Sequence, residues 1–293
     1  MNSYFAKSSW LDRIFTAIQY VIPQRGLSRL VFKLTRLAMG PLTYWLIKGF
    51  IKFYHVDMSS ARFAEVRYYT TFNQFFTREL KPTARPLSKQ AEIISPVDGE
   101  ISQIGQIEQG QLVQAKGHYF QLEDLLAKQT DIVTQFESGL FCTLYLSPRD
   151  YHRIHMPVNG QLTDMIYVPG RLFSVNQRTS RVVPNLFARN ERVICLFTTE
   201  VGPMALILVG ALLVGSIETV WSGVIIPNQL SQVQRWHYPP AQAPILSQGA
   251  ELGRFNMGST VILLFEAKQV SWLSEITVPQ KQFMGQSLAR RLR

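Results

Sequence analysis

The chain has 293 residues, of which 46% are hydrophobic and 17% are charged. This composition is typical of a folded protein with one large domain or two smaller ones, and it excludes a disordered chain. The net charge of +10 is uneven, because residues 1–55 contain eight Lys and Arg against one acidic residue, a local charge of +7. Such asymmetry indicates a polyanionic partner, either nucleic acid or an anionic membrane surface.

Two segments near the N-terminus have the apolar periodicity of amphipathic helices. Residues 27–38 place leucines on one face and Arg29, Lys33 and Arg36 on another, and residues 42–54 interleave aromatic residues with lysines. This pattern favours helices that lie in a membrane interface. The alternative is a pair of ordinary helices packed on the protein's own core. Charges recur too often in either segment for it to span a membrane.

An aromatic-rich helix is predicted over residues 61–80, and Pro82 and Pro86 follow it. We place a boundary there, between a helical region at residues 1–80 and a β-rich core at residues 81–293. The predicted fold class is therefore α+β, with N-terminal basic amphipathic helices followed by a β-rich core. Strands are expected at residues 99–107, 140–146, 161–168, 193–199, 204–209 and 216–220, and one helix at residues 122–129.

The two cysteines, Cys142 and Cys195, lie inside apolar strand-like runs and are expected to be buried thiols. No secretory signal is visible, so we expect a reducing compartment.

Three places carry residues capable of chemistry. Asp98 lies in an Asp-Gly turn, His152 and His155 are three residues apart, and Ser259 precedes an apolar run. Taken singly, each favours a structural explanation, such as a turn or a hydrogen-bonded histidine. No further ligands occur at metal-binding spacing, so a metal site is not expected.

Together these residues suggest a nucleophilic serine. A serine hydroxyl needs a base within hydrogen-bond reach, and a carboxylate that orients that base. The order along the chain would be Asp98, His155 and Ser259. The Gly-x-Ser-x-Gly signature of common hydrolases is absent from the sequence.

Seven segments in combination resemble the bacterial-type phosphatidylserine decarboxylases, pyruvoyl enzymes that make their own prosthetic group. The segments are residues 75–81 with 85–87, 95–99, 116–117 with Leu122 and 125–126, 150–157, 253–255, 258–260, and 284–286. Each is weak alone, but seven in family order are specific. One departure is Met257, where the family usually has leucine, an apolar residue of similar volume.

The resemblance implies that the chain first cleaves itself. His155, oriented by Asp98, would take the hydroxyl proton of Ser259, whose oxygen would attack the carbonyl carbon of Gly258. Elimination of the resulting ester would leave a Gly258 carboxylate. Ser259 would become a pyruvoyl group, with release of ammonia. The products, a large chain (residues 1–258) and a small chain (residues 259–293), would remain a heterodimer that can dimerise further.

The resemblance also implies a carboxy-lyase with a covalent pyruvoyl cofactor derived from Ser259. Its ketone would form a Schiff base with phosphatidylserine, and loss of CO2 would give phosphatidylethanolamine. His152 would donate the replacing proton. Membrane lipid, and not nucleic acid, would then be the polyanion. The chain would be a peripheral protein on the cytoplasmic face of the inner membrane.

Two alternatives are a serine hydrolase that keeps its chain intact and a non-enzymatic protein whose basic helices bind membranes.

Overall fold

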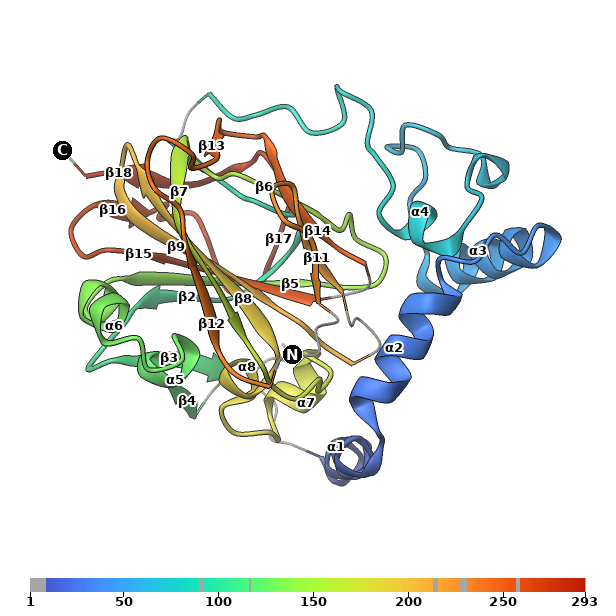
Figure 1. Cartoon of the computed structure of the whole chain (residues 1–293), viewed down its shortest axis with the longest axis horizontal. Helices are drawn as coiled ribbons and strands as arrows, with labels where there is room; N and C mark the ends of the chain where they lie inside the picture. Colours follow the sequence, from blue (N-terminus) through green and yellow to red (C-terminus); the bar gives the residue numbers. More distant parts are fainter. Residues whose placement is uncertain are drawn as a thin grey trace.

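The structure is a computed structural model that describes residues 9–89, 92–115, 117–212, 216–226, 231–256 and 259–292. A β-rich core makes up most of the molecule, and the N-terminal helices lie along one side of it (Figure 1). The α+β fold class is confirmed. The boundary proposed at residue 80 falls in the irregular stretch between α4 and β1, and it stays a prediction.

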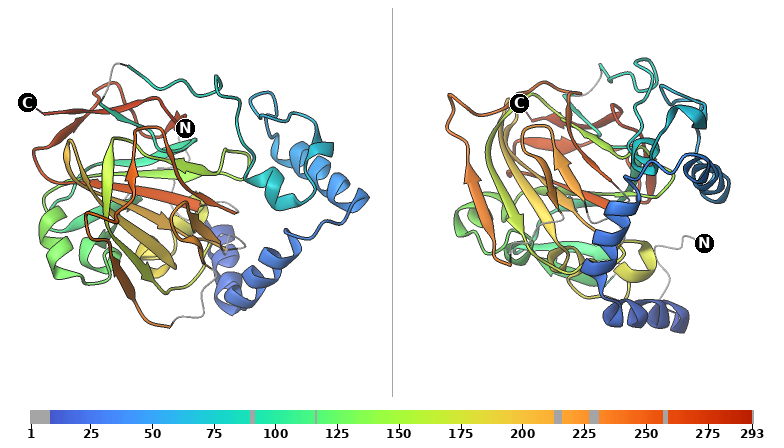
Figure 2. Two further views of the ribbon diagram at one scale, coloured as in Figure 1. Left: turned by 45° about the horizontal axis from the view of Figure 1, so that its top comes forward. Right: turned by 45° about the vertical axis from the view of Figure 1, so that its right-hand side comes forward.

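Three helices begin the described chain: α1 (Trp10–Val21), α2 (Gln24–Leu34) and α3 (Pro41–Tyr54). Helix α1 was not predicted from the sequence. It is started by a capping box, in which Ser9 and Asp12 each bond the other's backbone N–H. The helices predicted over residues 27–38 and 42–54 are confirmed, although α2 begins and ends earlier than predicted. Figure 2 shows α1 and α2 against the lower edge of the core and α3 farther from it.

The continuous helix predicted over residues 61–80 is wrong. The segment contains a single 3-10 turn, η2 (Val66–Tyr68), and the short helix α4 (Phe72–Phe76). Thr71 is extended (φ −130°, ψ 156°), and its side chain caps α4 by accepting a hydrogen bond from the Gln74 N–H. Ala61 pairs with Leu80 in an isolated β-bridge. The aromatic residues therefore form a compact cluster and not one face of a helix.

The helix predicted over residues 122–129 is shorter than expected. It forms α5 (Leu122–Leu125) and stops because Ala127 and Lys128 have positive φ angles of 53° and 58°. The helices α6 (Thr130–Phe136), α7 (Gln177–Ser180) and α8 (Leu186–Arg189) were not predicted. Buried residues of α5, α6 and α8 pack against one face of the central sheet.

Within the described ranges, a nine-stranded antiparallel sheet has the order β12-β7-β8-β9-β15-β5-β2-β17, with β13 paired to β7. Its strands are β2 (Gly99–Gln106), β5 (Leu140–Leu146), β7 (Gly160–Val168), β8 (Arg192–Thr199), β9 (Gly202–Val209), β12 (Gln234–His237), β13 (Ile245–Leu246), β15 (Ser259–Phe265) and β17 (Gln280–Gln282). The predicted strands in this sheet are confirmed to within two residues. Cys142 and Cys195 are buried, unbridged thiols, as expected.

Two smaller sheets and a hairpin complete the described core. The orders are β11-β10-β14-β6 and β1-β18-β16, and β3 pairs with β4. Their strands are β1 (Ile93–Ile94), β3 (Gln111–Ala115), β4 (His118–Gln121), β6 (Arg153–His155), β10 (Ile217–Thr219), β11 (Gly223–Ile226), β14 (Glu251–Phe255), β16 (Val270–Trp272) and β18 (Ser287–Arg291). Residues of β1, β6, β10, β14, β16 and β18 share one hydrophobic core with the central sheet.

Strand β15 runs through the middle of the central sheet, between β9 and β5, and all of its residues are buried. Side chains alternate along a strand. Val261, Leu263 and Phe265 therefore face the core between the sheets, and Ile262 and Leu264 face the helices. By this alternation, Ser259 points into the core between the sheets.

Candidate active site

Ser259 is the first residue of β15 and lies opposite Leu146 of β5. Its side chain is fully buried, and its Oγ has no hydrogen-bond partner in the described chain. A buried hydroxyl without a partner costs about 1–3 kcal/mol, so such an atom in a native protein needs an explanation. Gly258, the other predicted cleavage residue, and Met257 lie outside the described residues.

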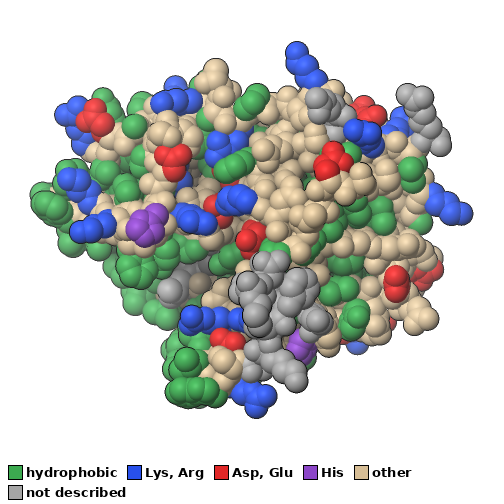
Figure 3. All heavy atoms as spheres, turned by 180° about the vertical axis from the view of Figure 1, so that it is seen from behind, with side chains coloured by type: hydrophobic (Ala, Val, Ile, Leu, Met, Phe, Trp, Pro, Cys, Tyr) green, Lys and Arg blue, Asp and Glu red, His purple; other side chains and the backbone are tan. Residues whose placement is uncertain are grey.

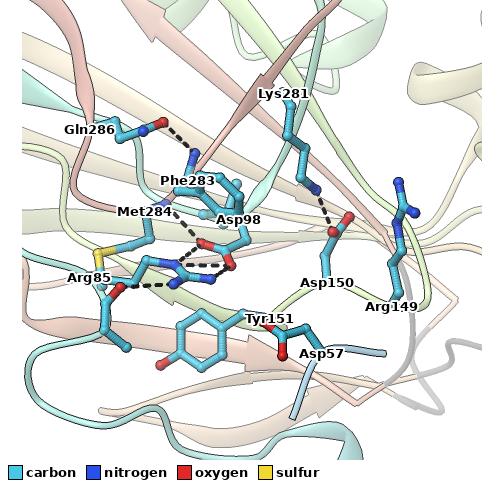
Figure 4. A network of polar contacts seen from close by, with 12 residues as sticks. Asp57, Arg85, Asp98, Arg149, Asp150, Tyr151, Lys281, Phe283, Met284 and Gln286 are labelled. Atoms are coloured by element: carbon cyan, nitrogen blue, oxygen red, sulfur yellow. Dashed lines mark hydrogen bonds and ion pairs between the residues drawn. The ribbon is translucent and has the colours of Figure 1, made fainter. Parts of the chain in front are cut away.

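Asp98 lies in the turn between β1 and β2 and is 3% exposed. The guanidinium of Arg85 binds both carboxylate oxygens, with Nε 2.8 Å from Oδ1 and Nη2 2.5 Å from Oδ2. The backbone N–H of Met284 also donates to Oδ1, at 2.9 Å (Figure 4). A bidentate arginine is a strong, directional partner for a carboxylate, so Asp98 is firmly held in this arrangement.

The strand register brings Asp98 and Ser259 to the same end of the strands in the central sheet. Glu100 of β2 and Thr260 of β15 both pair with Tyr145 of the intervening strand β5. Neighbouring strands lie about 4.8 Å apart, so β2 and β15, on either side of β5, are about 10 Å apart. The close approach of β2 to β5 requires Gly99, because a Cβ there would lie 2.7 Å from the carbonyl oxygen of Tyr145.

His155 ends β6, and its backbone N–H donates to the carbonyl of Pro96, two residues before Asp98. Its ring Nδ1 lies 2.8 Å from the carbonyl oxygen of Gly249, which can only accept, so Nδ1 carries the proton. Nε2 then accepts a hydrogen bond from the Tyr151 hydroxyl at 3.0 Å. Burial lowers the pKa of His155 below its ordinary value, so the neutral ring is favoured.

Asp98, His155 and Ser259 thus come from neighbouring segments, but no hydrogen bond joins any two of them among the described residues. The carboxylate of Asp98 accepts hydrogen bonds from Arg85 and Met284. The two ring nitrogens of His155 are hydrogen-bonded to Gly249 and Tyr151. Figure 4 shows the Tyr151 ring beside the Arg85–Asp98 pair. The relay from Asp98 through His155 to Ser259 therefore stays a prediction.

His152 is fully buried in the segment between β5 and β6. Its Nδ1 donates to the carbonyl oxygen of Asp150 at 2.8 Å, and its Nε2 has no partner in the described chain. The Phe76 ring lies 4.2 Å away, centroid to centroid. Burial lowers the pKa of His152 to about 4, so the ring is neutral near pH 7 and presents an open acceptor at Nε2.

The backbone places His152 close to the predicted cleavage point. The N–H of Phe255, at the end of β14, donates to the His152 carbonyl at 3.0 Å, and Phe255 is four residues before Ser259. Asp150 anchors the same loop by accepting hydrogen bonds from the Ser147 N–H and hydroxyl and by pairing with Lys281. His152 and Ser259 are thus buried groups of one region, each with an unpartnered polar atom.

Arg85, which binds Asp98, and Tyr151, which binds His155, were not identified as site residues from the sequence. Both lie inside segments that carry the family resemblance, but nothing in their spacing shows that they bind Asp98 and His155. The contact between Asp98 and Met284 joins positions 186 residues apart. In the part of the chain that the structure describes, His, Cys, Asp and Glu form no group of three or more able to hold a metal ion.

Comparisons with known proteins support one family. The family model described as phosphatidylserine decarboxylase matches residues 72–290, and a model described as PSD matches residues 14–55. The phosphatidylserine decarboxylase proenzyme of Vibrio vulnificus is 51% identical over 284 residues, which cover 96% of this chain and 100% of the relative. That of Photobacterium profundum is 52% identical over 282 residues, which cover 95% and 97%. The chain therefore belongs to the phosphatidylserine decarboxylase family.

Proposed function

We propose that the chain cleaves itself between Gly258 and Ser259 and then decarboxylates phosphatidylserine to phosphatidylethanolamine and CO2. The observation that carries the proposal is the buried, unpartnered Oγ of Ser259 at the start of β15. A structural serine at this position would be expected to bond a neighbour. The name proenzyme, which the relatives carry, fits a chain that is processed.

Self-cleavage begins when a base takes the hydroxyl proton of Ser259 and its Oγ attacks the Gly258 carbonyl carbon. The peptide nitrogen takes up a proton as the amide becomes an ester. Elimination then removes the Cα proton of residue 259 and breaks the bond between its Oγ and Cβ, which frees the Gly258 carboxylate and leaves dehydroalanine. Addition of water converts this residue to pyruvoyl and ammonia.

Two histidines are candidates for the base. His155 is the family-based choice, but the Tyr151 hydroxyl must first leave its Nε2 and Asp98 must turn from Arg85 to orient it. His152 has the open acceptor in the described arrangement. We propose His155 as the base and His152 as the residue that later delivers a proton to the carbon that loses CO2. A ring with a pKa near 4 releases a proton readily once it has gained one.

The residues around Ser259 fit a pyruvoyl group. Ser259 is fully buried at the start of β15, which pairs with a strand on each side, and an open histidine nitrogen lies in the same region. The ketone of the group, when formed, supplies the electron sink that decarboxylation requires. The chain's own contribution is to exclude water, to fix the position of the ketone through β15, and to deliver a proton from His152 Nε2.

The N-terminal helices turn polar residues inward and apolar residues outward. In α1, Asp12, Thr16 and Gln19 are buried, and the exposed apolar residues are Trp10, Leu11, Ile14, Phe15, Ile18 and Val21. The Gln19 side chain binds the Ser174 N–H and the Thr179 hydroxyl. This inversion is unfavourable in water and favourable at a lipid surface.

Helices α2 and α3 extend the exposed apolar surface. Leu30, Leu34, Leu42, Trp45, Leu46 and Phe53 are all exposed. A groove of about 720 Å³ along α3, beside the end of α2, is lined mostly by apolar side chains. Figure 3 shows hydrophobic side chains gathered at this end of the molecule, with Lys and Arg among them. No helix in the described ranges is long and apolar enough to cross a membrane.

We therefore propose that α1, α2 and α3 hold the chain on an anionic membrane as a peripheral protein. Each cation near the surface contributes about 1 kcal/mol, so replacing Arg29, Lys33 and Arg36 by Gln should weaken vesicle binding roughly 100-fold at low salt. A matched triple replacement of the exposed residues Lys268, Arg290 and Arg291 is the control. Equal losses in both variants would contradict the assignment. The cytoplasmic face of the inner membrane stays a prediction from the family resemblance.

A denaturing gel and a CO2-release assay test the enzymatic proposal. The wild-type chain should separate into two pieces of residues 1–258 and 259–293 and release CO2 from phosphatidylserine. Ser259→Ala and His155→Ala should stay uncut, and His152→Ala should be cut but decarboxylate poorly. A single full-length band from active protein would contradict self-cleavage. An uncut His152→Ala together with a normally cut His155→Ala would reverse the two histidine roles.

A further inference from the structure

Arg78 is a buried cation with few partners. It follows α4, and 4% of its surface is exposed. Its Nη2 donates to the carbonyl oxygen of Arg149 at 3.2 Å, and its guanidinium lies 5.5 Å from the centroid of the Phe75 ring. Its Nε has no hydrogen-bond partner in the described chain, and none of the ion pairs among the described residues includes Arg78.

Arg192 shows what a purely structural buried arginine looks like in this protein. It is also buried, but its guanidinium donates to four backbone carbonyls, those of Leu125, Ala188, Asn190 and Asp124, at 2.6 to 3.0 Å. These acceptors compensate the loss of water around the charge. Arg78 has one such acceptor, and the carboxylates of Asp98, Asp150 and Asp57 act on its charge from a distance without bonding its Nε. A buried charge with donors left over is costly unless a ligand supplies the missing acceptors.

The position of Arg78 links it to the candidate active site. Arg78 donates to the carbonyl of Arg149, and His152 donates to the carbonyl of the next residue, Asp150. The consecutive residues Phe75 and Phe76 lie against the Arg78 guanidinium and the His152 ring, respectively. The two side chains are thus held by neighbouring backbone groups and neighbouring aromatic rings. Each presents a buried nitrogen without a partner.

We propose that Arg78 binds the phosphate diester in the headgroup of the lipid substrate. This assignment rests on the proposed decarboxylase function. The headgroup of phosphatidylserine carries two anions, a carboxylate and a phosphate. An arginine paired with the carboxylate would stabilise the reactant, whose charge disappears as CO2 leaves, and would raise the barrier. The phosphate keeps its charge throughout, so an arginine contact there strengthens binding without opposing the reaction.

Kinetics with short-chain phosphatidylserine test the assignment. Arg78→Met should raise KM about 10- to 100-fold, because a charge-assisted hydrogen bond is lost, and should change kcat by only a few-fold. Arg78→Lys, which keeps the charge but loses the planar donors, should fall between Met and wild type. Arg67→Met, which removes an exposed arginine of the same segment, is the matched control and should leave KM unchanged.

Binding of short-chain phosphatidylethanolamine, measured by calorimetry on the cleaved protein, identifies the anion. This product retains the phosphate and lacks the carboxylate, so Arg78→Met should weaken its binding by the same 10- to 100-fold factor. A raised KM for phosphatidylserine with an unchanged affinity for phosphatidylethanolamine would assign Arg78 to the carboxylate and overturn the proposal. An unchanged KM together with an unchanged phosphatidylethanolamine affinity would overturn any ligand role.

The extent of self-cleavage separates binding from folding. If Arg78→Met and Arg78→Lys both remain uncut, Arg78 serves the folding of the precursor and the assignment is overturned. If the wild-type chain releases no CO2 from phosphatidylserine, the proposed function itself fails. If the wild-type chain is active and the Arg78 variants keep its KM and its phosphatidylethanolamine affinity, only the assignment of Arg78 fails.

Discussion

Removing the Arg85 side chain should destabilise the protein strongly, because it would leave the Asp98 carboxylate buried without its main partner. In this ion pair the side chains are 17% and 4% exposed, and two oxygens are bound by one guanidinium. Breaking a buried pair by deleting one partner typically costs about 3–5 kcal/mol. We expect a loss of this size in Arg85→Met, since among the described residues only the Met284 N–H would still bond Asp98.

Urea unfolding of the uncut Ser259→Ala background is the suitable assay, because every variant is then one intact chain. The Asp98→Asn variant and the Arg85→Met/Asp98→Asn double variant complete a double-mutant cycle. We expect the double variant to lose clearly less than the sum of the single losses, because the amide needs no counter-ion. Arg62→Met is the matched control. Its ion pair with Glu79 has side chains 59% and 43% exposed, and its loss should cost at most about 1 kcal/mol.

The comparison with Arg62→Met shows whether the buried Arg85–Asp98 pair stabilises the protein more than an exposed pair does. If Arg85→Met is no more destabilised than that control, and the cycle shows additive losses, the pair contributes nothing to stability. Asp98 would then be free to leave Arg85 for His155 at little cost, and self-cleavage would need no energetic compensation for that step.

Three further outcomes are expected. Gly99→Ala should destabilise the folded protein by about 1–3 kcal/mol and slow self-cleavage, because its Cβ would lie 2.7 Å from a β5 carbonyl. In the control Gly105→Ala the nearest contact of the Cβ is 3.5 Å, so both the free energy of unfolding and self-cleavage should be nearly unchanged. The pKa of His152 falls on folding from an ordinary 6.5 to about 4, so protons favour the unfolded chain. The free energy of unfolding should therefore drop by about 3 kcal/mol as the pH falls through this window, and less in His152→Gln; equal drops would refute this. Phe76→Leu should weaken the desolvation of His152 and raise its pKa. The alkaline limb of the kcat profile in the cleaved enzyme, which reports loss of the proton that His152 donates, should then move to higher pH; an unmoved limb would show that Phe76 does not tune this ring.

The hydrophobic pattern of a local segment predicted its secondary structure correctly where every residue of the element is buried. The run 261–265 predicted a buried strand, and β15 is buried at every position. The prediction failed at residues 61–80, where aromatic periodicity resembled that of a helix. Contacts with α3, which the local pattern does not contain, keep the segment folded on itself, with Phe50 packing on Phe72, Phe75 and Phe76.

The sequence also could not predict which face of the N-terminal helices is buried. The periodicity of α2 shows that apolar and basic residues separate onto two faces, but it does not say which face meets the core. In the structure, the polar Gln24 and Ser28 are buried and Leu30 and Leu34 are exposed. Hydrogen bonds decide this orientation. The Gln24 side chain accepts from the Leu172 N–H, 148 residues away, and donates to the Gln19 carbonyl.

The fold class and most strands of the central sheet could be predicted from the sequence alone, and Asp98, His152, His155 and Ser259 could be proposed from it as the candidate site. Only the tertiary structure decided which atoms these groups meet. Asp98 is bound by Arg85 and Met284, His155 by Gly249 and Tyr151, and Ser259 Oγ and His152 Nε2 are left without described partners. The physical reason is that a strand needs only the alternation of its own residues, whereas a hydrogen bond needs two atoms within about 3 Å, which distant segments bring together only when the whole chain is packed.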